Sequence, residues 1–173
     1  MAMNDVTSDG FPAPFVTAPM AIEPAWIDYN GHLNFAYYLV LFDHTIDAGL
    51  LQVGLGPDYV SERSASYFTV ELHTHYLREL ALGDPVTGTL QLLDHDAKRV
   101  HVYMELRHAE EGWVAAACEQ LFLHVDMATK KTSPFPPDVL ERLSLMQAAH
   151  AVLPVSPRVG HVIAIPRRAG AAD

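Results

Sequence analysis

The segment Trp26–Asn34 holds the densest group of residues that could do chemistry. It places the carboxylate of Asp28 shortly before Asn34, a residue that can cap a helix, with Gly31 turning the chain between them. A helix N-terminus offers unpaired N–H groups and a partial positive charge, which can hold a developing oxyanion. A nearby carboxylate can activate water or attack a carbonyl carbon. The spacing therefore fits acyl transfer, and the alternative is that Asp28 and Asn34 only shape a turn and a cap.

A second group of candidate residues follows the pattern His73-x-His75-x-x-x-Glu79. Residues two apart on a strand point to the same face, so Glu71 joins the two histidines. Such ligands could hold a transition metal. The spacing matches only part of the first cupin motif, and the second cupin motif is absent. We therefore expect no metal here, and expect polar residues of a subunit interface or a site wall instead.

A long helix would have to position the first group. Asn34 can cap a helix that runs to about Leu51, and its first half, Phe35–Phe42, is apolar all round. A helix of that kind must be wrapped by the rest of the fold. The sequence therefore predicts that this helix lies at the centre of the structure.

Alternating or apolar segments elsewhere predict strands. A segment broken by prolines, 15–27, fits an edge strand, and an amphipathic pattern predicts a helix over 138–150. Four further strands are predicted over 67–77, 86–93, 99–108 and 113–125. Because their connections are short, we expect them to form an antiparallel meander. The fold class is α+β, an antiparallel sheet wrapped around a long central helix.

Composition narrows the class of protein. The 173 residues include 11 Lys and Arg against 21 Asp and Glu, a net charge of −10, which argues against nucleic acid and anionic membranes as partners. The single cysteine, Cys118, fits a reducing compartment, and the first residues do not have the pattern of a signal peptide. We expect a cytoplasmic protein with a flexible leader at 1–14, one domain at 15–150, and an extended arm at 151–173.

The motif Asp28-x-x-Gly31-His32-x-Asn34, followed by an aromatic-rich helix, resembles the signature of hotdog-fold acyl-CoA thioesterases of the 4-hydroxybenzoyl-CoA type. The likeness covers about residues 15–130. It implies that Asp28 is the catalytic carboxylate and that backbone N–H groups near Asn34 and Phe35 polarise the thioester carbonyl. It implies that His32 and Asn34 shape the site. It implies no metal or redox cofactor, since CoA enters only as part of the substrate.

The same resemblance implies an assembly. Hotdog proteins pair edge to edge through the strand after the helix, here 67–77, which places the active sites at the subunit interface. We therefore expect a homodimer or homotetramer that binds an acyl-CoA. The residues expected to contact the substrate are Trp26, Tyr29, Gly31, Tyr37, Tyr38, Glu71, His73 and Arg78.

A finer resemblance concerns the acyl group. The runs 68–79 and 91–99 are similar to the thioesterases that accompany, or are fused to, bacterial carnitine dehydrogenases and that hydrolyse betainyl-CoA. Its trimethylammonium group is of a kind that aromatic faces and carboxylates can hold. Two alternatives stay open: a hotdog enoyl-CoA hydratase or dehydratase that pairs His32 with Asp28, and a non-catalytic module that binds acyl-CoA.

Overall fold

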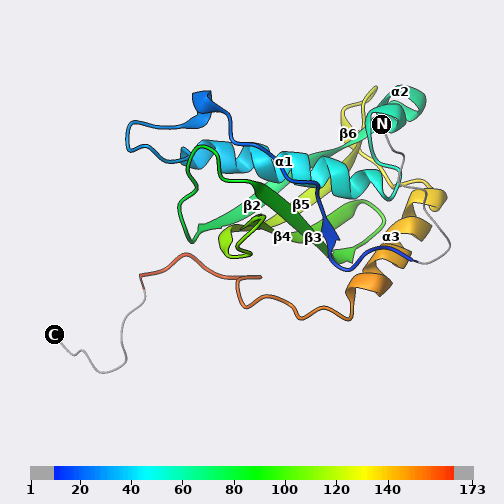
Figure 1. The fold of residues 1–173 in the computed structure, drawn as a ribbon. Helices are drawn as coiled ribbons and strands as arrows, with labels where there is room; N and C mark the ends of the chain where they lie inside the picture. The colour runs from blue at the N-terminus through cyan, green and yellow to red at the C-terminus, as the bar shows by residue number, and fades with distance from the viewer. Residues whose placement is uncertain (1–9, 166–173) are drawn as a thin grey trace.

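The computed structural model describes residues 10–165, and its centre is a curved antiparallel sheet with the long helix α1 (Phe35–Leu51) across one face (Figure 1). The strand order is β1-β3-β4-β5-β2, and β6 pairs with β5. The strands are β1 (Phe15–Val16), β2 (Ala65–Tyr76), β3 (Val86–His95), β4 (Arg99–His108), β5 (Val114–Asp126) and β6 (Lys131–Thr132). The remaining helices are the 3-10 turn η1 (Pro24–Trp26), α2 (Pro57–Arg63) and α3 (Pro137–His150).

The predicted meander is correct for three strands and wrong for the fourth. Strands β3, β4 and β5 follow one another as antiparallel neighbours, but β2 pairs with β5 along its whole length instead of with β3. The connection between β2 and β3 is longer than a hairpin loop, and Leu80 within it is fully buried. It therefore crosses the end of the sheet and leaves β2 as an edge strand.

Helix α1 begins where the sequence predicts, because Asn34 caps it: the side-chain oxygen of Asn34 accepts from the N–H of Ala36 at 3.0 Å. One face of α1, including Leu41, Phe42 and Ile46, is buried against the sheet. The helix lies so close to β3 that a Cβ at Gly88 would fall 1.9 Å from the hydroxyl of Thr45. Its other face carries polar residues, so within one chain the sheet covers α1 from one side.

The N-terminal segment differs from the predicted strand. Only Phe15–Val16 pairs with β3, followed by a single bridge from Met20 to Val86. Pro19 and Pro24 interrupt the ladder because proline has no N–H to donate, and the chain turns into η1 instead. Helix α2 lies between the predicted long helix and the predicted strand 67–77, where the sequence predicts no element. No described helix has the length and hydropathy that crossing a bilayer requires.

The two ends of the chain pack against the domain where they are described. In the predicted leader, Pro12 accepts a hydrogen bond from the buried His150 at 2.8 Å, and Phe11 packs on the core. The arm after α3 runs along the face of the sheet opposite α1 (Figure 1). Residues 1–9 of the leader and 166–173 of the arm lie outside the described residues, and the bounds 15–150 stay a prediction.

Candidate active site

The Asp28 turn is closed by hydrogen bonds at both of its ends. The N–H of Asp28 donates to the carbonyl of His32 at 3.0 Å, and the N–H of Gly31 donates to the carbonyl of Asp28 at 3.0 Å. Gly31 has φ +85°, a conformation that favours glycine. An isolated β-bridge joins Ile27 to Leu33. The turn therefore holds the half-buried Asp28 in a fixed position beside the start of α1.

The carboxylate of Asp28 uses one oxygen to shape this turn. Its Oδ1 accepts from the N–H of Asn30 at 2.8 Å, while Oδ2 lies 3.5 Å from the amide nitrogen of the Asn30 side chain. Asp28 therefore does shape a turn, which is the alternative role that the sequence left open for it. The turn does not use the whole carboxylate of Asp28, because a carboxylate has several lone pairs and Oδ2 makes only this long contact.

The first turn of α1 leaves a backbone donor available beside the Asp28 turn. Asn34 Oδ1 accepts from Ala36, and the Asn34 carbonyl accepts from the N–H of Tyr37. Within residues 10–165, the N–H of Phe35 makes no hydrogen bond. Such a donor at a helix N-terminus suits an anionic oxygen. Asp28, Asn34 and Phe35 thus lie together as the sequence predicts, and their catalytic roles stay predictions.

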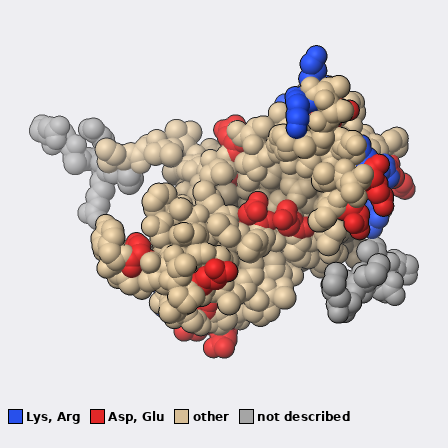
Figure 2. Space-filling view, turned by 90° about the horizontal axis from the view of Figure 1, so that it is seen from above, with Lys and Arg blue, Asp and Glu red and all other residues tan. Residues whose placement is uncertain are grey.

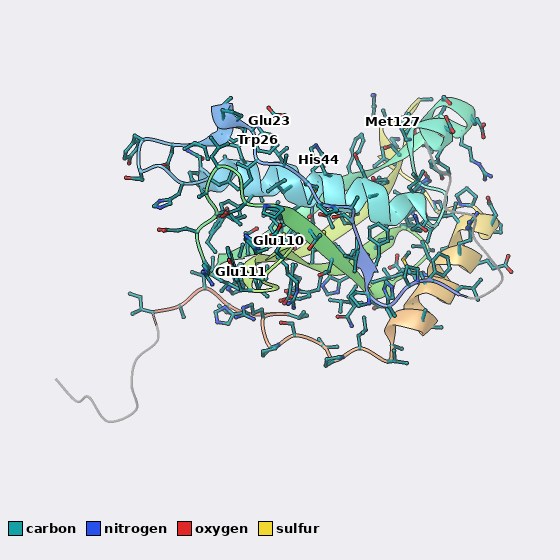
Figure 3. The ribbon with its side chains drawn as sticks, viewed as in Figure 1. Glu23, Trp26, His44, Glu110, Glu111 and Met127 are labelled. Carbon is teal, nitrogen blue, oxygen red and sulfur yellow. The ribbon has the colours of Figure 1, made fainter. Side chains whose placement is uncertain are left out.

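Aromatic side chains surround this end of α1. The rings of Trp26 and Tyr37 stack with centroids 5.5 Å apart and planes 12° from parallel. Trp26 lies on η1, above the start of α1 (Figure 3). Tyr38 is buried beneath the helix and its hydroxyl accepts from the N–H of Leu80, whereas Tyr29 is 97% exposed. Trp26 and Tyr37 therefore offer an aromatic surface at the site, and Tyr29 contacts little within one chain.

Tyr76 is a residue of this region that the sequence analysis did not single out. Its hydroxyl donates to the carbonyl of Phe35 at 3.1 Å, and its ring meets the rings of Phe35 and Tyr38 edge to face. Burial raises the pKa of Tyr76, so the hydroxyl stays protonated and can donate. Tyr76 thus fixes the first peptide unit of α1 against the end of β2. Strand alternation from the buried positions of β2 is the signal that could have placed it.

His32 does not pair with Asp28. Its Nε2 lies 3.3 Å from a carboxylate oxygen of Glu79, and both side chains are well exposed. The His32–Asp28 pair that a hydratase would use is therefore not formed within the chain. Among the described residues, His73 and His75 group with His161 and not with Glu79, so the pattern His73-x-His75-x-x-x-Glu79 does not form one cluster.

Glu71 and His73 lie on the other face of the sheet. His73 is paired in register with Glu119 of β5, and residues directly opposite each other share a face. Glu119 contacts His101, which alternates with the buried residues Val100 and Val102 of β4. The structure thus does not bring Glu71 and His73 together with Asp28 in one chain. Their predicted contact with the substrate stays untested.

Basic side chains are sparse near the Asp28 turn. In the view of Figure 2, Lys and Arg gather at the end of the molecule with α2 and β6, and the opposite end shows carboxylates. Arg63, Arg99 and Arg107 are paired with carboxylates. Arg78 instead lies over the ring of Trp113, 3.9 Å from its centroid. Like Arg142 and Arg158, Arg78 takes part in no ion pair within the described residues, so its charge is available to an anionic ligand.

Fold and site together define a thioester hydrolase of the hotdog fold. The model of the thioesterase-like superfamily matches residues 22–143, which is well over half of the chain, and the chain belongs to this superfamily. A Pseudomonas aeruginosa protein named betainyl-CoA thioesterase is 39% identical over 143 residues, covering 83% of this chain and 90% of that one. A Rhizobium meliloti protein, L-carnitine dehydrogenase/betainyl-CoA thioesterase, is 42% identical over 132 residues, 76% of this chain but 26% of that longer one.

Solved structures give the same family. A Staphylococcus aureus protein in complex with CoA superposes with a TM-score of 0.82 at 29% identity, over 88% of this chain and 96% of that one. A thioesterase structure from Pseudomonas putida KT2440 superposes with a TM-score of 0.76 at 35% identity, over 91% and 100% of the two chains. The resemblance in the sequence, the fold class and thioester hydrolysis are therefore confirmed.

Proposed function

We propose that this thioesterase hydrolyses its substrate at Asp28 and the amino end of α1. The observation that carries this proposal is the unpaired N–H of Phe35 beside a carboxylate fixed in a closed turn. The N–H would donate a hydrogen bond to the thioester oxygen, which gains negative charge as the carbonyl carbon becomes tetrahedral. An electrostatic donor of this kind contributes most when its position is set beforehand, as Asn34 and Tyr76 set it here.

Two roles of Asp28 fit this position. As a general base it takes a proton from water, the hydroxide adds to the carbonyl carbon, and the carbon–sulfur bond breaks to release CoA and the free acid. As a nucleophile it forms a mixed anhydride that water then opens. Both routes consume only thioester and water, so neither calls for a redox cofactor or a catalytic metal.

We propose betainyl-CoA as the substrate, on the strength of the names of the two relatives and of the aromatic surface at the site. Its acyl group ends in a trimethylammonium cation. The Trp26 and Tyr37 rings lie at the start of α1, and the face of an indole ring is the strongest aromatic partner for such a cation. Arg78 is the proposed contact for a phosphate of CoA.

The deciding experiment compares two acyl-CoAs of the same shape. Thiol release is followed with a chromogenic thiol reagent, using betainyl-CoA and its uncharged carbon isostere, 3,3-dimethylbutanoyl-CoA, beside straight-chain acyl-CoAs. We expect the largest kcat/KM for betainyl-CoA. A preference for the isostere would contradict the proposed substrate but not the thioesterase, and binding without turnover of any thioester would favour a non-catalytic module.

We also propose that the chain works as a homodimer, or as a tetramer of such dimers, joined through β2. This strand lies at the edge of the sheet and exposes apolar side chains, including Phe68 at 42% and Val70 at 50%. A long apolar edge strand left open is a site for pairing with another chain. Light scattering on a sizing column should show a dimer or tetramer that Phe68→Lys dissociates and that Val152→Lys, at an exposed site after α3, leaves intact.

A cytoplasmic location is proposed with this function. CoA thioesters belong to intracellular metabolism, and the only cysteine has no partner for an intrachain disulfide. Cys118 is fully buried, and burial raises the pKa of its thiol to about 11, so it is a packing residue with little thiolate. Cys118 therefore has no part in the proposed hydrolysis.

A further inference from the structure

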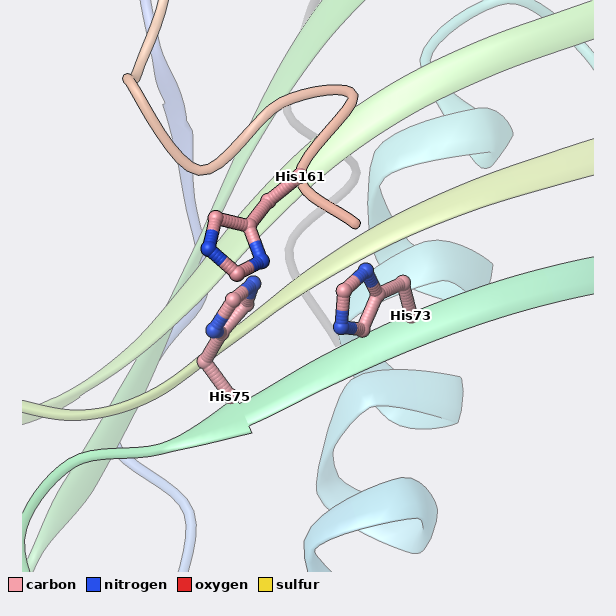
Figure 4. Close-up of side chains that lie close together, drawn as sticks. All are labelled: His73, His75 and His161. Carbon is pink, nitrogen blue, oxygen red and sulfur yellow. The ribbon is translucent and has the colours of Figure 1, made fainter. Parts of the chain in front are cut away.

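We propose that His73, His75 and His161 form a binding site for a divalent transition-metal ion, and that this ion ties the C-terminal arm to β2. Each imidazole offers one nitrogen, and these nitrogens all lie within 4.8 Å of one another (Figure 4). Two of the ligands come from one strand and the third from a segment far along the chain. The site differs from the sequence pattern at which we expected no metal, because His161 stands in the place of Glu79.

The three rings meet on the face of the sheet that α1 does not cover. His73 and His75 are two apart on β2, and their rings stack with centroids 4.5 Å apart. His161 lies over both rings, with its centroid 5.1 Å from that of His75 and 5.9 Å from that of His73. In Figure 4 the arm descends onto the pair while the helix lies behind the sheet. An ion bound here is therefore separate from the Asp28 turn.

The state of His75 favours metal binding. Its Nε2 is buried and has no hydrogen-bond partner among the described residues. The charged and titratable groups that face His75 are His73, Glu119 of β5, and Arg158 and His161 of the arm. A buried ring nitrogen without a hydrogen-bond partner can serve as a ligand atom for an ion.

The surroundings of the three rings are acidic. His73 and His161 border a cavity of about 610 Å³ between the sheet and the arm, whose lining includes Glu71, Asp94, Asp96 and Glu119. Arg99 is the only Lys or Arg among the lining residues, and it is paired with Asp96. The excess of carboxylates creates a negative potential that attracts a cation. The cavity also leaves room for water at a fourth coordination position.

The ligand set indicates which ions would bind. Imidazole nitrogen suits Zn²⁺, Co²⁺, Ni²⁺ and Cu²⁺, whereas Mg²⁺ and Ca²⁺ prefer oxygen. An ion lies in the plane of each imidazole that holds it. The stacked rings of His73 and His75 must therefore turn about their side-chain bonds when the ion binds.

Such an ion would add a firm attachment of the arm to the sheet. Between Ser156 and the end of the described chain, two hydrogen bonds join the arm to the sheet: Gly160 N–H to Glu119 at 2.7 Å, and Ser156 hydroxyl to Tyr103 at 3.0 Å. The apolar side chains of Val162, Ile163 and Ile165 are 78–84% exposed, so burial contributes little. A metal bond through His161 would hold the arm by its middle.

The test uses the full chain without a histidine tag, stripped with a chelator and returned to buffer at pH 7.5. Titration with Co²⁺ should produce visible absorption bands that saturate at one ion per chain, and Zn²⁺ should displace them. His161→Ala should weaken binding by at least the roughly 10- to 100-fold that loss of an outer-shell partner costs at metal sites. His161 is exposed, so this change does not endanger the fold.

His44→Ala is the matched control, because His44 is exposed on the far side of α1 (Figure 3) and should leave uptake unchanged. Absence of saturable Co²⁺ uptake, or equal uptake by wild type and His161→Ala, would overturn the proposal. Thiol release measured on the same samples separates this site from the proposed function. The stripped protein and His161→Ala should keep wild-type turnover, and loss of turnover on stripping would show that the ion is not merely a tie for the arm.

Discussion

The Asp28 turn and the histidine cluster differ in how the chain builds them. The turn and the first residue of α1 lie within one short run of sequence, and local hydrogen bonds set their geometry. The cluster joins β2 to an arm that follows α3, and only the folded chain brings its members together. The first region can therefore be recognised as a motif, while the second becomes visible only in three dimensions.

The two regions also lie on opposite faces of the sheet. At the Asp28 turn, a carboxylate faces a helix N-terminus, an arrangement suited to an oxyanion. On the other face, imidazoles lie beside a cavity lined by carboxylates, which is suited to a cation. If the two regions act independently, a substitution in one should leave the function of the other unchanged.

Phe35→Pro should abolish most of the hydrolysis. Proline removes the N–H of residue 35 yet is favoured at the first position of a helix, and Asn34 already has the extended conformation that precedes a proline (φ −61°, ψ 139°). Loss of one oxyanion donor should lower kcat about 10²- to 10³-fold. Phe35→Ala is the control, because it removes the same ring but keeps the N–H. Equal kcat values for the two variants would show that this N–H is not used.

Trp26→Leu should reduce the preference for a cationic acyl group. A cation over an indole face is stabilised by about 0.5–2 kcal/mol, so kcat/KM for betainyl-CoA should fall roughly 2- to 30-fold. The uncharged isostere, 3,3-dimethylbutanoyl-CoA, should show a smaller fall. Equal losses with both substrates would mean that Trp26 acts by packing on Tyr37 and not by recognising charge.

Acidification should release the arm before it affects the domain. Because the folded pKa of His75 lies below the ordinary value of about 6.5, the unfolded site binds protons more readily, and the stabilisation is lost as pH falls below that value. The protection factors of the backbone amides of residues 158–162, taken relative to the intrinsic exchange rate at each pH, should therefore fall as the pH drops from about 6.5 to the lowered pKa. His75→Asn, which does not titrate, should flatten this dependence, and an unchanged profile in that variant would contradict it.

Glu119→Gln should loosen the arm slightly. The carboxylate accepts from the N–H of Gly160 and contacts His101, and a charged acceptor is stronger than an amide oxygen. Hydrogen exchange at Gly160 should rise a few-fold, consistent with about 1 kcal/mol for one hydrogen bond. Turnover should stay at the wild-type value. A fall in turnover of similar size would contradict the independence of the two faces of the sheet.

The helix and the strands were predictable from the sequence where local signals are strong. The cap at Asn34 fixes the start of α1, and the alternation of 99–108 gives β4 its observed bounds. The place of β2 was not predictable, because strand order depends on a crossover held by the burial of Leu80. Residues 15–27 failed as a strand because proline competes with the ladder.

In the candidate site, too, contacts between residues close in sequence were predictable, and contacts between distant segments were not. Asp28, Asn34 and Phe35 come together as expected because they are close in sequence. Contacts across the sheet were missed: Tyr76 on the Phe35 carbonyl, Glu79 on His32, and His161 on the histidine pair. The contacts of Tyr76 and of the histidine pair depend on which face of β2 a residue occupies, and the bulge between Thr69 and Glu71 shifts that alternation along the strand. Glu79 lies beyond the end of β2.

The most direct measurement is kcat/KM for thiol release by Asp28→Asn beside the wild type and Asp58→Asn. Asparagine can still accept from the Asn30 N–H, so the turn and the melting temperature should be preserved while the charge is lost. We predict a fall of about 10²- to 10⁴-fold for Asp28→Asn. Asp58, exposed on α2, should show none. Wild-type turnover in Asp28→Asn would contradict the account, because Asp28 would then be only a turn residue.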